Sequence, residues 1–382
     1  MPFLKSTIFF IKLIFIPVKV DFVLVSLNHF NRSYGKNDFL QPIKEDLKKS
    51  NKSFLYFEDT DLKGAYRKFP RSDEAIGFDF ITFCLIALKK IGMSHKASIK
   101  VLRAVFFRNL DYKFLINMAG YTLSFFSEMF PTRTHFELQH GLIFNNREWW
   151  MLDNWNKFQN CGILLNGKGS KEILLSNKDY VSKESSKLLI IGGKDIKKNY
   201  FPNNQIKNIL FTEQITIDNS SLEIKEYIDF FCTILMNNID FIRSHNIFIY
   251  IKEHPRIPNS LNSRYSDFEF VIDINKLENN SLFAHLTFNS SSVFEYSLMG
   301  IPSIIIDGLS RRDPKFLLDT YKMPATDLLI NKNTSFKEII QRLEDNNYFH
   351  NKSKEFESWS GQFFEDHNPE ILTEIVKSKN FS

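Results

Sequence analysis

The sequence has few cysteines, and no two of them lie at metal-binding spacing. Its three cysteines, Cys84, Cys161 and Cys232, form no C-x-x-C motif. An odd number leaves one thiol unpaired in any disulfide scheme, and structural zinc sites need clustered thiols or imidazoles. We therefore expect a reducing compartment, no structural zinc, and no resident metal or other cofactor.

The sequence also lacks a hydrophobic run long enough to cross a membrane. The most apolar stretch, residues 8–18, contains Lys12 and Pro17 and is much shorter than the roughly 20 residues of a spanning helix. No small-residue cleavage site follows it, so a signal peptide is not indicated. We interpret the stretch as a core helix or strand, and the protein as cytoplasmic.

A second interpretation keeps this N-terminal stretch at a membrane surface. Lysines that flank apolar side chains are typical of an interfacial anchor. The residues concerned are Lys5, Lys12 and Lys19 around Phe9, Phe10, Ile14 and Phe15. The protein would then be peripheral, on the cytoplasmic face of the inner membrane.

The charge balance excludes a dedicated nucleic-acid binder. Lys and Arg number 49 against 44 Asp and Glu, and the basic residues are scattered along the chain. A net charge of +5 suits an anionic small-molecule ligand or an acidic membrane surface. The 43% of hydrophobic residues exclude wholesale disorder, and 382 residues favour two domains. The forty phenylalanines are interpreted as compositional drift.

Short β-branched or aromatic runs alternate with helical patterns along the first half of the chain. Such alternation predicts parallel βαβ units. The predicted strands are Asp21–Ser26, Ser53–Glu58, His135–Leu138, Gly162–Leu165 and Lys187–Ile191. The predicted helices are Phe78–Ile91 and Tyr112–Phe130.

A polar segment with one proline, Lys194–Gln205, separates this series from a second one. The second series has predicted strands at Ile209–Thr212, Ile247–Lys252, Glu269–Asp273, Ala284–Phe288 and Ser303–Asp307. Its predicted helices are Leu222–Ser244, Ser292–Met299, Ser335–Glu344 and Pro369–Lys377. We predict an α/β protein with two Rossmann-like domains, residues 1–200 and 201–382, facing each other across a cleft. The last helix would pack back on the first domain.

The first cluster of polar residues after a predicted strand is Glu137-Leu138-Gln139-His140-Gly141. Ligands of such domains bind beyond the carboxyl ends of the strands. Here a strand ends in two hydrogen-bonding side chains, and a glycine allows a turn or a close approach by a ligand. The alternative is a buried histidine whose hydrogen bonds are satisfied within the protein.

The second cluster, Lys252-Glu253-His254-Pro255, follows the apolar strand IFIYI. A lysine and a histidine at one strand end suit a phosphate by charge and by hydrogen bonding, and Pro255 fixes the backbone. A His-Pro dipeptide alone is a weak signal.

The third cluster is Asn289-Ser290-Ser291-Ser292-x-x-Glu295, at the predicted start of a helix. Hydroxyl groups and free N–H groups there predict an anion site. Ser292 and Glu295 also match a capping box, which leaves Ser290 and Ser291 available to a ligand. Gly300 is interpreted as the glycine that ends the helix.

Together these motifs resemble GT-B glycosyltransferases of bacterial capsule and O-antigen assembly. The resemblance covers roughly residues 134–307 and rests on ELQHG, KEHP and NSSSxxEYSLMGIPSI. The most similar groups in pattern are sialyltransferases and Kdo-transferases, which use CMP-activated acidic sugars. Teichoic-acid-type glycerophosphotransferases have a similar His-Gly, His-Pro and Ser-Ser layout.

The resemblance implies a metal-independent enzyme with a nucleotide-sugar co-substrate. Residues 1–200 would form the acceptor-side domain and residues 201–382 the nucleotide-sugar domain. His254 would contact the donor phosphate and help the nucleotide leave. The other implied contacts are Lys252, Pro255, Ser290, Ser291 and Ser292 to the phosphate, Glu295 to the ribose, and Gln139, His140 and Gly141 on the acceptor wall.

The general base stays open. The sialyltransferase groups place an acidic pair before a glycine in the first domain, where this sequence has Gln139-His140-Gly141. The candidates are His140, Glu137 and Glu213, the last of which lies in the loop FTEQ. A rival metal-dependent GT-A chemistry could use the acidic motif Glu58–Asp61, which we interpret as a solvated acidic turn.

The expected function is transfer of sialic acid or Kdo from a CMP donor onto a surface-polysaccharide or lipooligosaccharide acceptor. One alternative is a CDP-alditol phosphotransferase of the teichoic-acid type. Another is a non-catalytic binding module of an envelope-assembly complex. The presence of His140, His254 and three consecutive serines argues against the binding module, because a decayed site would have lost some of them.

Overall fold

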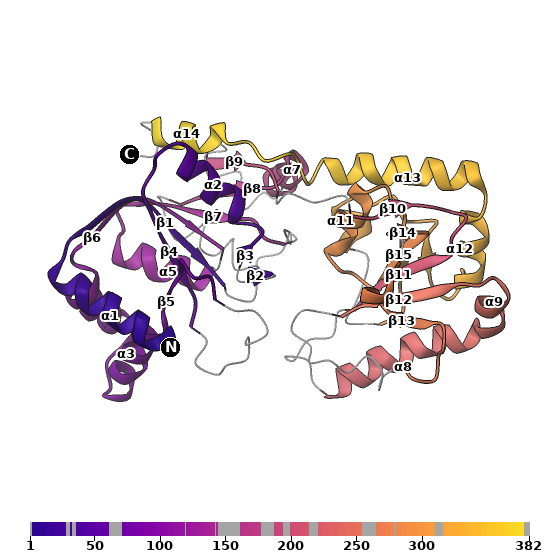
Figure 1. Cartoon of the computed structure of the whole chain (residues 1–382), viewed down its shortest axis with the longest axis horizontal. Helices are drawn as coiled ribbons and strands as arrows, with labels where there is room; N and C mark the ends of the chain where they lie inside the picture. The colour runs from indigo at the N-terminus through magenta and orange to yellow at the C-terminus, as the bar shows by residue number, and fades with distance from the viewer. Residues whose placement is uncertain are drawn as a thin grey trace. The chain divides into compact units, whose positions relative to one another are not determined.

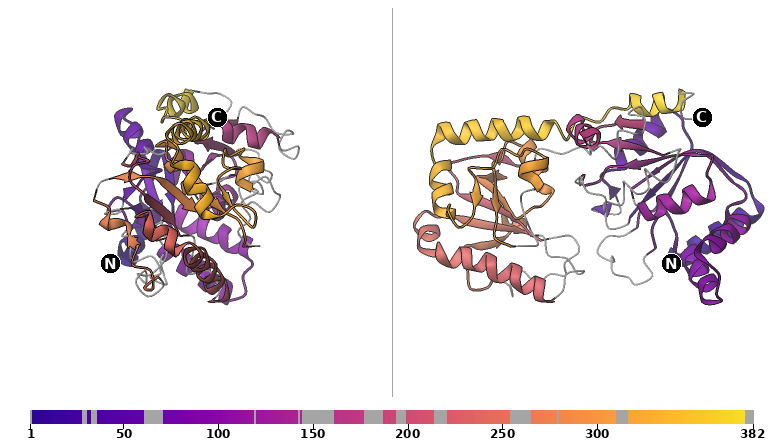
Figure 2. Two further views of the ribbon diagram at one scale, coloured as in Figure 1. Left: turned by 90° about the vertical axis from the view of Figure 1, so that its right-hand side faces the viewer. Right: turned by 180° about the vertical axis from the view of Figure 1, so that it is seen from behind.

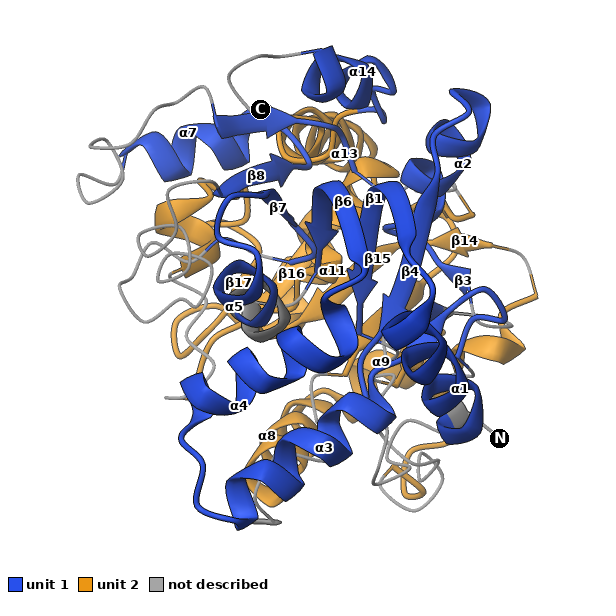
Figure 3. Cartoon of the chain, turned by 90° about the vertical axis from the view of Figure 1, so that its left-hand side faces the viewer, with its two compact units in different colours: residues 1–195, 366–382 blue, residues 196–365 orange. Residues whose placement is uncertain are grey.

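The chain folds into two units, each built on a parallel β-sheet (Figures 1 and 3). One unit comprises residues 1–195 and 366–382, and the other comprises residues 196–365. The computed structural model describes residues 2–27, 31–32, 36–60, 71–118, 120–141, 143, 161–176, 187–193, 199–213, 221–253, 265–278, 280–309 and 316–377. The predicted α/β class with two Rossmann-like sheets is confirmed.

The first sheet has its earliest strand in the middle. The order is β5 (Ile76–Gly77), β4 (Phe54–Glu58), β1 (Val18–Ser26), β6 (Leu110–Asn117), β7 (Thr134–Leu138), β8 (Cys161–Leu165) and β9 (Leu188–Ile190). All neighbouring pairs are parallel. The strand order therefore reverses between β1 and β6, and the carboxyl ends of both strands lie at the same edge. A small antiparallel pair, β2 (Asn31–Arg32) and β3 (Lys36–Asn37), stands apart from this sheet.

Helices cover both faces of the first sheet, because successive strand residues point to opposite sides. Phe57 belongs to the core on one face and Tyr56 to the core on the other. The first face packs against α1 (Pro2–Phe15), α3 (Asp79–Lys90), α4 (His95–Leu102), the π-helical turn Arg103–Phe107 and α5 (Gly120–Met129). The second packs against α2 (Gln41–Lys49) and α14 (Glu370–Lys377), while α7 (Lys168–Ser176) follows β8.

The single helix predicted over Tyr112–Phe130 is wrong. The segment contains the central strand β6 and then helix α5. Because β6 is buried on both faces, its residues are apolar on nearly every side, and such a run resembles a buried helix. Asn117 and Gly120 mark the break between the two elements.

The second sheet repeats the same strand order. Its members are β13 (Val271–Asp273), β12 (Phe248–Lys252), β11 (Asn208–Thr212), β15 (Ala284–Thr287), β16 (Ser303–Ile306) and β17 (Leu329–Ile330). The pairs are parallel, and the order reverses between β11 and β15. A separate two-stranded sheet joins β10 (Phe201–Pro202) to β14 (Ser281–Leu282). A 3₁₀ turn, Ile274–Lys276, and a π-helical turn, Phe316–Thr320, complete the unit.

Aromatic side chains fix the helices on this sheet. The second unit contains α8 (Ser221–Asn237), α9 (Ile239–Ser244), α11 (Ser292–Leu298), α12 (Phe336–Leu343) and α13 (Asn346–Gly361). Phe231 of α8 stacks on Phe211 of β11 at 3.9 Å, whereas Tyr296 of α11 packs on Leu210 at the opposite face. The predicted helix Leu222–Ser244 is interrupted at Asn238, which separates α8 from α9.

The last helix, drawn in yellow beside the C-terminus in Figure 2, belongs to the first unit. Leu372 and Ile375 of α14 lie in the same core as α2. The chain reaches them past Gly192, which has φ +86°, and the Asn368 N–H donates to the Ile191 carbonyl at 2.8 Å. A Cβ on Gly192 would lie 2.2 Å from the Asp366 carbonyl oxygen, so the glycine allows this close passage.

We predict that Gly192→Ala lowers the free energy of unfolding by about 2 kcal/mol or more, because it adds left-handed strain to a backbone clash. Urea unfolding curves measure the change. Gly361→Ala is the matched control, since a Cβ there meets nothing within 4 Å and the backbone is helical. Equal stability of the two variants would contradict the tight passage.

Candidate functional site

Three neighbouring strands of the second sheet end beside one another and carry most of the predicted phosphate-binding residues. Lys252 ends β12 and pairs in register with Thr212, which ends β11. The serines Ser290–Ser292 follow β15, the neighbour of β11 on its other side. These residues therefore gather at the carboxyl edge, beside the point where the strand order reverses.

A buried histidine holds this edge together. The imidazole of His285 lies in β15 with its Nε2 2.9 Å from Thr212 Oγ1 and 3.2 Å from Ser292 Oγ. Its Nδ1 lies 3.0 Å from Ser303 Oγ, and its ring stacks on Tyr296 at 4.6 Å. Burial, with the charge of Lys252 nearby, lowers the His285 pKa to about 3, so the ring is neutral at pH 7.

The capping box predicted from Ser292 and Glu295 does not form. The capping position is Ser291, which has helical backbone angles, and its side chain makes no capping hydrogen bond. The Ser292 hydroxyl lies against His285 instead and donates to Ser290 Oγ at 3.0 Å. The serine loop is therefore held from the sheet side. Gly300, with φ +75°, ends the helix as predicted.

Lys252 points toward the helix that follows the serine loop. Its Nζ donates to the Tyr296 hydroxyl at 2.9 Å and lies 5.2 Å from the centroid of that ring. The side chain is partly exposed, so a cation stands at the same face of the sheet as His285 and Ser292. This arrangement can place one positive charge and several hydroxyl groups near a bound anion.

Glu213 lies on the opposite face of the same strand end. It is fully buried, and its Oε1 accepts a hydrogen bond from the Tyr265 hydroxyl at 3.0 Å. The Tyr265 ring packs edge-on against Phe231 of α8. The carboxyl group of Glu213 is thus on the α8 side of the sheet rather than beside the serines.

In the first unit, the Gln139 side chain forms hydrogen bonds that connect the ends of two neighbouring strands. It is buried, and its Nε2 donates to the Gly141 carbonyl at 3.1 Å and to Ser170 Oγ at 3.1 Å. Its Oε1 accepts the Asn166 N–H at 3.0 Å. Gln139 therefore ties the end of β7 to the end of β8 and the start of α7, and its amide does not line an open wall.

His140 is the partly exposed member of the three candidate bases. Its Nδ1 lies 3.4 Å from the Leu138 carbonyl oxygen, and burial lowers its pKa to about 4. The imidazole is therefore neutral at pH 7 and can accept a proton. A Cβ on Gly141 would meet no atom of the described residues within 4 Å.

Glu137 is a buried carboxyl group without a hydrogen-bond partner among the described residues. Burial raises its pKa well above the ordinary value, which favours the neutral acid. It shares a sheet face with His135, whose nitrogens lie 2.9 Å from the Tyr112 hydroxyl and 2.8 Å from Ser127 Oγ. Each sheet thus contains one buried histidine held by hydroxyl groups.

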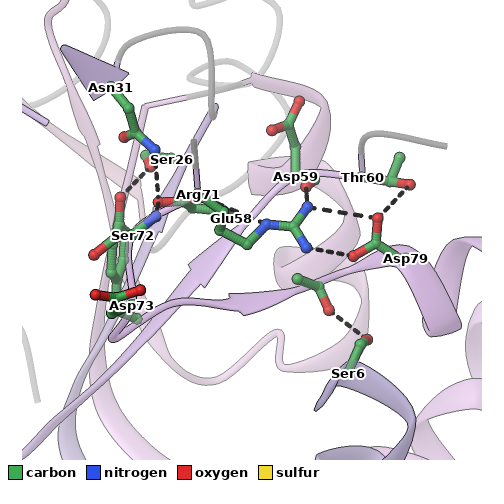
Figure 4. Close-up of polar contacts among 12 residues, drawn as sticks. Ser6, Ser26, Asn31, Glu58, Asp59, Thr60, Arg71, Ser72, Asp73 and Asp79 are labelled. Atoms are coloured by element: carbon green, nitrogen blue, oxygen red, sulfur yellow. Dashed lines mark hydrogen bonds and ion pairs between the residues drawn. The ribbon is translucent and has the colours of Figure 1, made fainter. Parts of the chain in front are cut away.

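The first two residues of the acidic motif at the end of β4 are not solvated (Figure 4). Glu58 and Asp59 are buried. The Arg71 guanidinium pairs with Asp79 at 2.6 Å, donates to the Asp59 carbonyl at 2.8 Å, and lies 3.5 Å from Glu58 Oε2. The arginine therefore supplies positive charge beside Glu58 and Asp79, while Asp61 lies outside the described residues.

Two of the predicted site residues, His254 and Pro255, lie outside the described residues. Across the part of the chain that is described, no group of three or more acidic, histidine or cysteine side chains could hold a metal ion. The three cysteines are free thiols.

His285, Thr212 and Tyr296 belong to this site but were not among the residues predicted from the sequence. The signal for His285 was a single histidine inside the otherwise apolar strand AHLTF. An isolated polar residue on a buried strand needs partners, which the hydroxyl groups of neighbouring strands supply.

No model of a known protein family matches the sequence, and no curated protein is similar to it. Solved structures are similar in fold. They include UDP-GlcNAc 2-epimerase from Methanocaldococcus jannaschii, with a TM-score of 0.55, 14% identity, and coverage of 94% of this chain and 99% of that one. S. aureus MnaA in complex with UDP has a TM-score of 0.58 and 11% identity, with coverage of 95% and 98%.

A variant of the wall teichoic acid polymerase TagF is also similar in fold. Its TM-score is 0.52 at 15% identity, over 93% of this chain and 87% of that one. The chain has a GT-B type of fold.

We predict that burial of neutral His285 makes stability depend on pH in a defined direction. Its folded pKa of about 3 lies below the unfolded value of about 6.5, so the unfolded chain takes up a proton first as the pH falls. Between these two pKa values, each unit by which the pH falls should lower the free energy of unfolding by about 1.4 kcal/mol through this histidine. In His285→Gln the free energy of unfolding should therefore fall less steeply with pH, by about 1.4 kcal/mol per pH unit.

The measurement is urea unfolding at about pH 6 and about pH 4.5, both inside the window set by the two pKa values. Comparing slopes rather than absolute stabilities removes the cost of the substitution itself. The comparison also removes the contribution of the buried carboxyl groups Glu58 and Glu137 to the slope. Their raised pKa values make stability increase as the pH falls, and they do so equally in both proteins. Identical slopes would show that His285 titrates normally.

Proposed function

We propose that the protein is a metal-independent glycosyltransferase that takes a sugar from a nucleotide donor. The best candidate donor is CMP-linked sialic acid or Kdo, and the acceptor is a surface saccharide or glycolipid. The observation that carries the proposal is the group at the carboxyl edge of the second sheet. There Lys252 and the serine loop flank the end of β11, beside the reversal of strand order where such folds bind nucleotides.

The donor phosphate is assigned to this edge on chemical grounds. A leaving phosphate needs positive charge and hydrogen-bond donors arranged in advance. Lys252 supplies charge, and Ser290 and Ser291 supply hydroxyl groups. Ser292 is committed to His285 and acts by holding the loop in place. His254 and Pro255 follow Lys252 in sequence, and His254 would donate to the departing oxygen. Glu295 is kept as the proposed contact to the ribose.

His140 is the proposed general base. It would take the proton of the acceptor hydroxyl as that oxygen bonds to the anomeric carbon and the bond to the donor phosphate breaks. Its partial exposure at the end of β7 supports this role. Glu137 and Glu213 are buried, which disfavours direct contact with an acceptor. Gly141 would leave room for the acceptor.

A CDP-alditol phosphotransferase is the second candidate, because it would use the same Lys, His and Ser groups on a diphosphate. A UDP-sugar epimerase is a third outcome, prompted by the similar fold of UDP-GlcNAc 2-epimerase. A thermal-shift screen with CMP, CDP, UDP and GDP separates the nucleotide classes, since a site filled at 100 times its Kd adds about 2.7 kcal/mol. Chromatography of the released nucleotide and sugar, with excess EDTA present, then identifies the reaction. Absence of a shift with any nucleotide would contradict the proposal.

We predict that Ser291→Ala weakens nucleotide binding about tenfold and leaves the melting temperature nearly unchanged. A hydrogen bond to a charged group contributes about 1.5–3 kcal/mol, and Ser291 makes no capping hydrogen bond to lose. Isothermal titration measures the affinity. Ser266→Ala, an exposed serine of the same unit, is the control. A lower melting temperature with unchanged affinity would give Ser291 a structural role instead.

We also predict that His254→Ala lowers turnover by about 10²-fold or more, the size expected for losing one donor to the leaving group. His254→Asn should restore part of the rate if hydrogen bonding dominates, and little if a proton is transferred. His245→Ala, at an exposed histidine of the same unit, should have the wild-type rate. A wild-type rate in His254→Ala would refute the phosphate assignment.

A further inference from the structure

Helix α1 is apolar on two opposite sides. Its inner side packs into the first core through Phe10 and Leu13, and Ser6 Oγ donates to the Gly77 carbonyl at 2.6 Å. At 100° per residue, the side facing away from that core forms a second stripe. Its members and their exposed fractions are Leu4 54%, Ile8 45%, Ile11 45% and Phe15 73%.

Helix α3 lies beside α1 and extends the exposed apolar surface (Figure 3). Phe83, Ile86 and Ile91 are all exposed. The rings of Phe3 and Phe83 meet edge to face, with 6.1 Å between their centroids, and join the two helices. We call these exposed side chains the α1–α3 patch: Phe3, Leu4, Ile8, Ile11, Phe15, Phe83, Ile86 and Ile91. A contiguous apolar surface on a folded unit usually marks an interaction site.

The two segments that carry the patch are rich in basic side chains, and of these Lys19 lies 3.9 Å from the Asp111 carboxylate. Residues 2–19 and 79–108 contain nine Lys and Arg and a single acidic residue, Asp79. Asp79 is buried and paired with Arg71 at 2.6 Å, so it adds no negative charge to the surface. Lys12 and Lys90 are exposed beside the apolar stripes. The rest of the chain has slightly more acidic than basic residues, so the positive charge is local.

The geometry of α1 suits a helix that lies on a membrane. Fourteen residues span about 21 Å, less than the roughly 30 Å of hydrocarbon. None of the described helices is long and apolar enough to cross a bilayer. The inner contacts of Ser6, Phe10 and Leu13 hold α1 against the core. The side chains of the outer stripe therefore all point away from the core on the same side of the helix.

We infer that the α1–α3 patch docks the protein on a bilayer that contains anionic lipids. The apolar side chains enter the interface between headgroups and acyl chains, and the surrounding lysines contact lipid phosphates. The inference corrects the residue set of the predicted anchor, because Phe10 is a core residue and α3 with its C-cap supplies three of the eight side chains. It rests on this patch alone and is independent of the proposed catalytic chemistry.

The test is sedimentation of the full-length protein with vesicles. We expect binding to vesicles of phosphatidylcholine mixed with phosphatidylglycerol, weaker binding to phosphatidylcholine alone, and loss of binding at high salt. Lys12→Gln with Lys90→Gln should weaken partitioning about 25-fold, since each lysine near an anionic surface contributes about 1 kcal/mol. Ile8→Ser, Ile11→Ser and Phe83→Ser together should weaken it by about 100-fold or more.

Matched controls come from the second unit. Leu222→Ser with Met236→Ser changes side chains that are 70% and 58% exposed, and Lys225→Gln with Lys332→Gln removes two exposed charges. These variants should bind vesicles as the wild type does. Because all the substituted residues are exposed, unchanged circular dichroism and melting temperature are expected throughout.

Two outcomes would overturn the inference. One is equal binding to both kinds of vesicle, or none to either. The other is a lipid-free dimer that the Ile8, Ile11 and Phe83 substitutions convert to a monomer, which would make the patch a contact between two copies of the chain. Membrane binding without nucleotide binding would refute the proposed function and leave this inference intact.

Discussion

Both units obey one constraint, which is that every strand of their main sheets runs in the same direction. In such a sheet all carboxyl ends share an edge, and residues far apart in sequence meet there without any special folding. The earliest strand, β1 or β11, lies inside its sheet, so later strands are added on both sides of it. Loops on the two sides then diverge, and a groove for a ligand opens where the order reverses.

A buried neutral histidine reinforces this edge in the second unit. Removal from water disfavours the charged imidazole, and the neutral ring has one donor and one acceptor. A hydroxyl group can donate or accept a hydrogen bond. The hydroxyl groups of Thr212, Ser292 and Ser303 can therefore all bond to the ring nitrogens of His285. The result is a fixed serine loop whose outward residue, Ser291, keeps its hydroxyl group for other partners.

Local patterns in the sequence predicted most strands and the polar loops after them, because a buried strand followed by a loop has a characteristic composition. They failed where one local pattern permits two structures. The run from Tyr112 to Phe130 is mostly apolar, so neither period could distinguish a central strand from a helix. Ser292 matched a cap, yet His285, nearby in space, bonds its hydroxyl group. Arg71 likewise lies 3.5 Å from the Glu58 carboxyl group, although no motif in the sequence joins the two residues.

The N-terminal helix links the two proposals made for the first unit. Ser6 near the start of α1 bonds to Gly77, at the carboxyl end of β5, so the Phe3 end of the patch lies beside the carboxyl edge of the first sheet. That edge is also where β7 ends and His140 follows. The patch and the proposed base therefore share one edge of the sheet, with β4, β1 and β6 between β5 and β7. Neighbouring strands lie about 4.8 Å apart, so an acceptor saccharide attached to a membrane lipid would have to extend over about 19 Å of this edge to bring its hydroxyl group to His140.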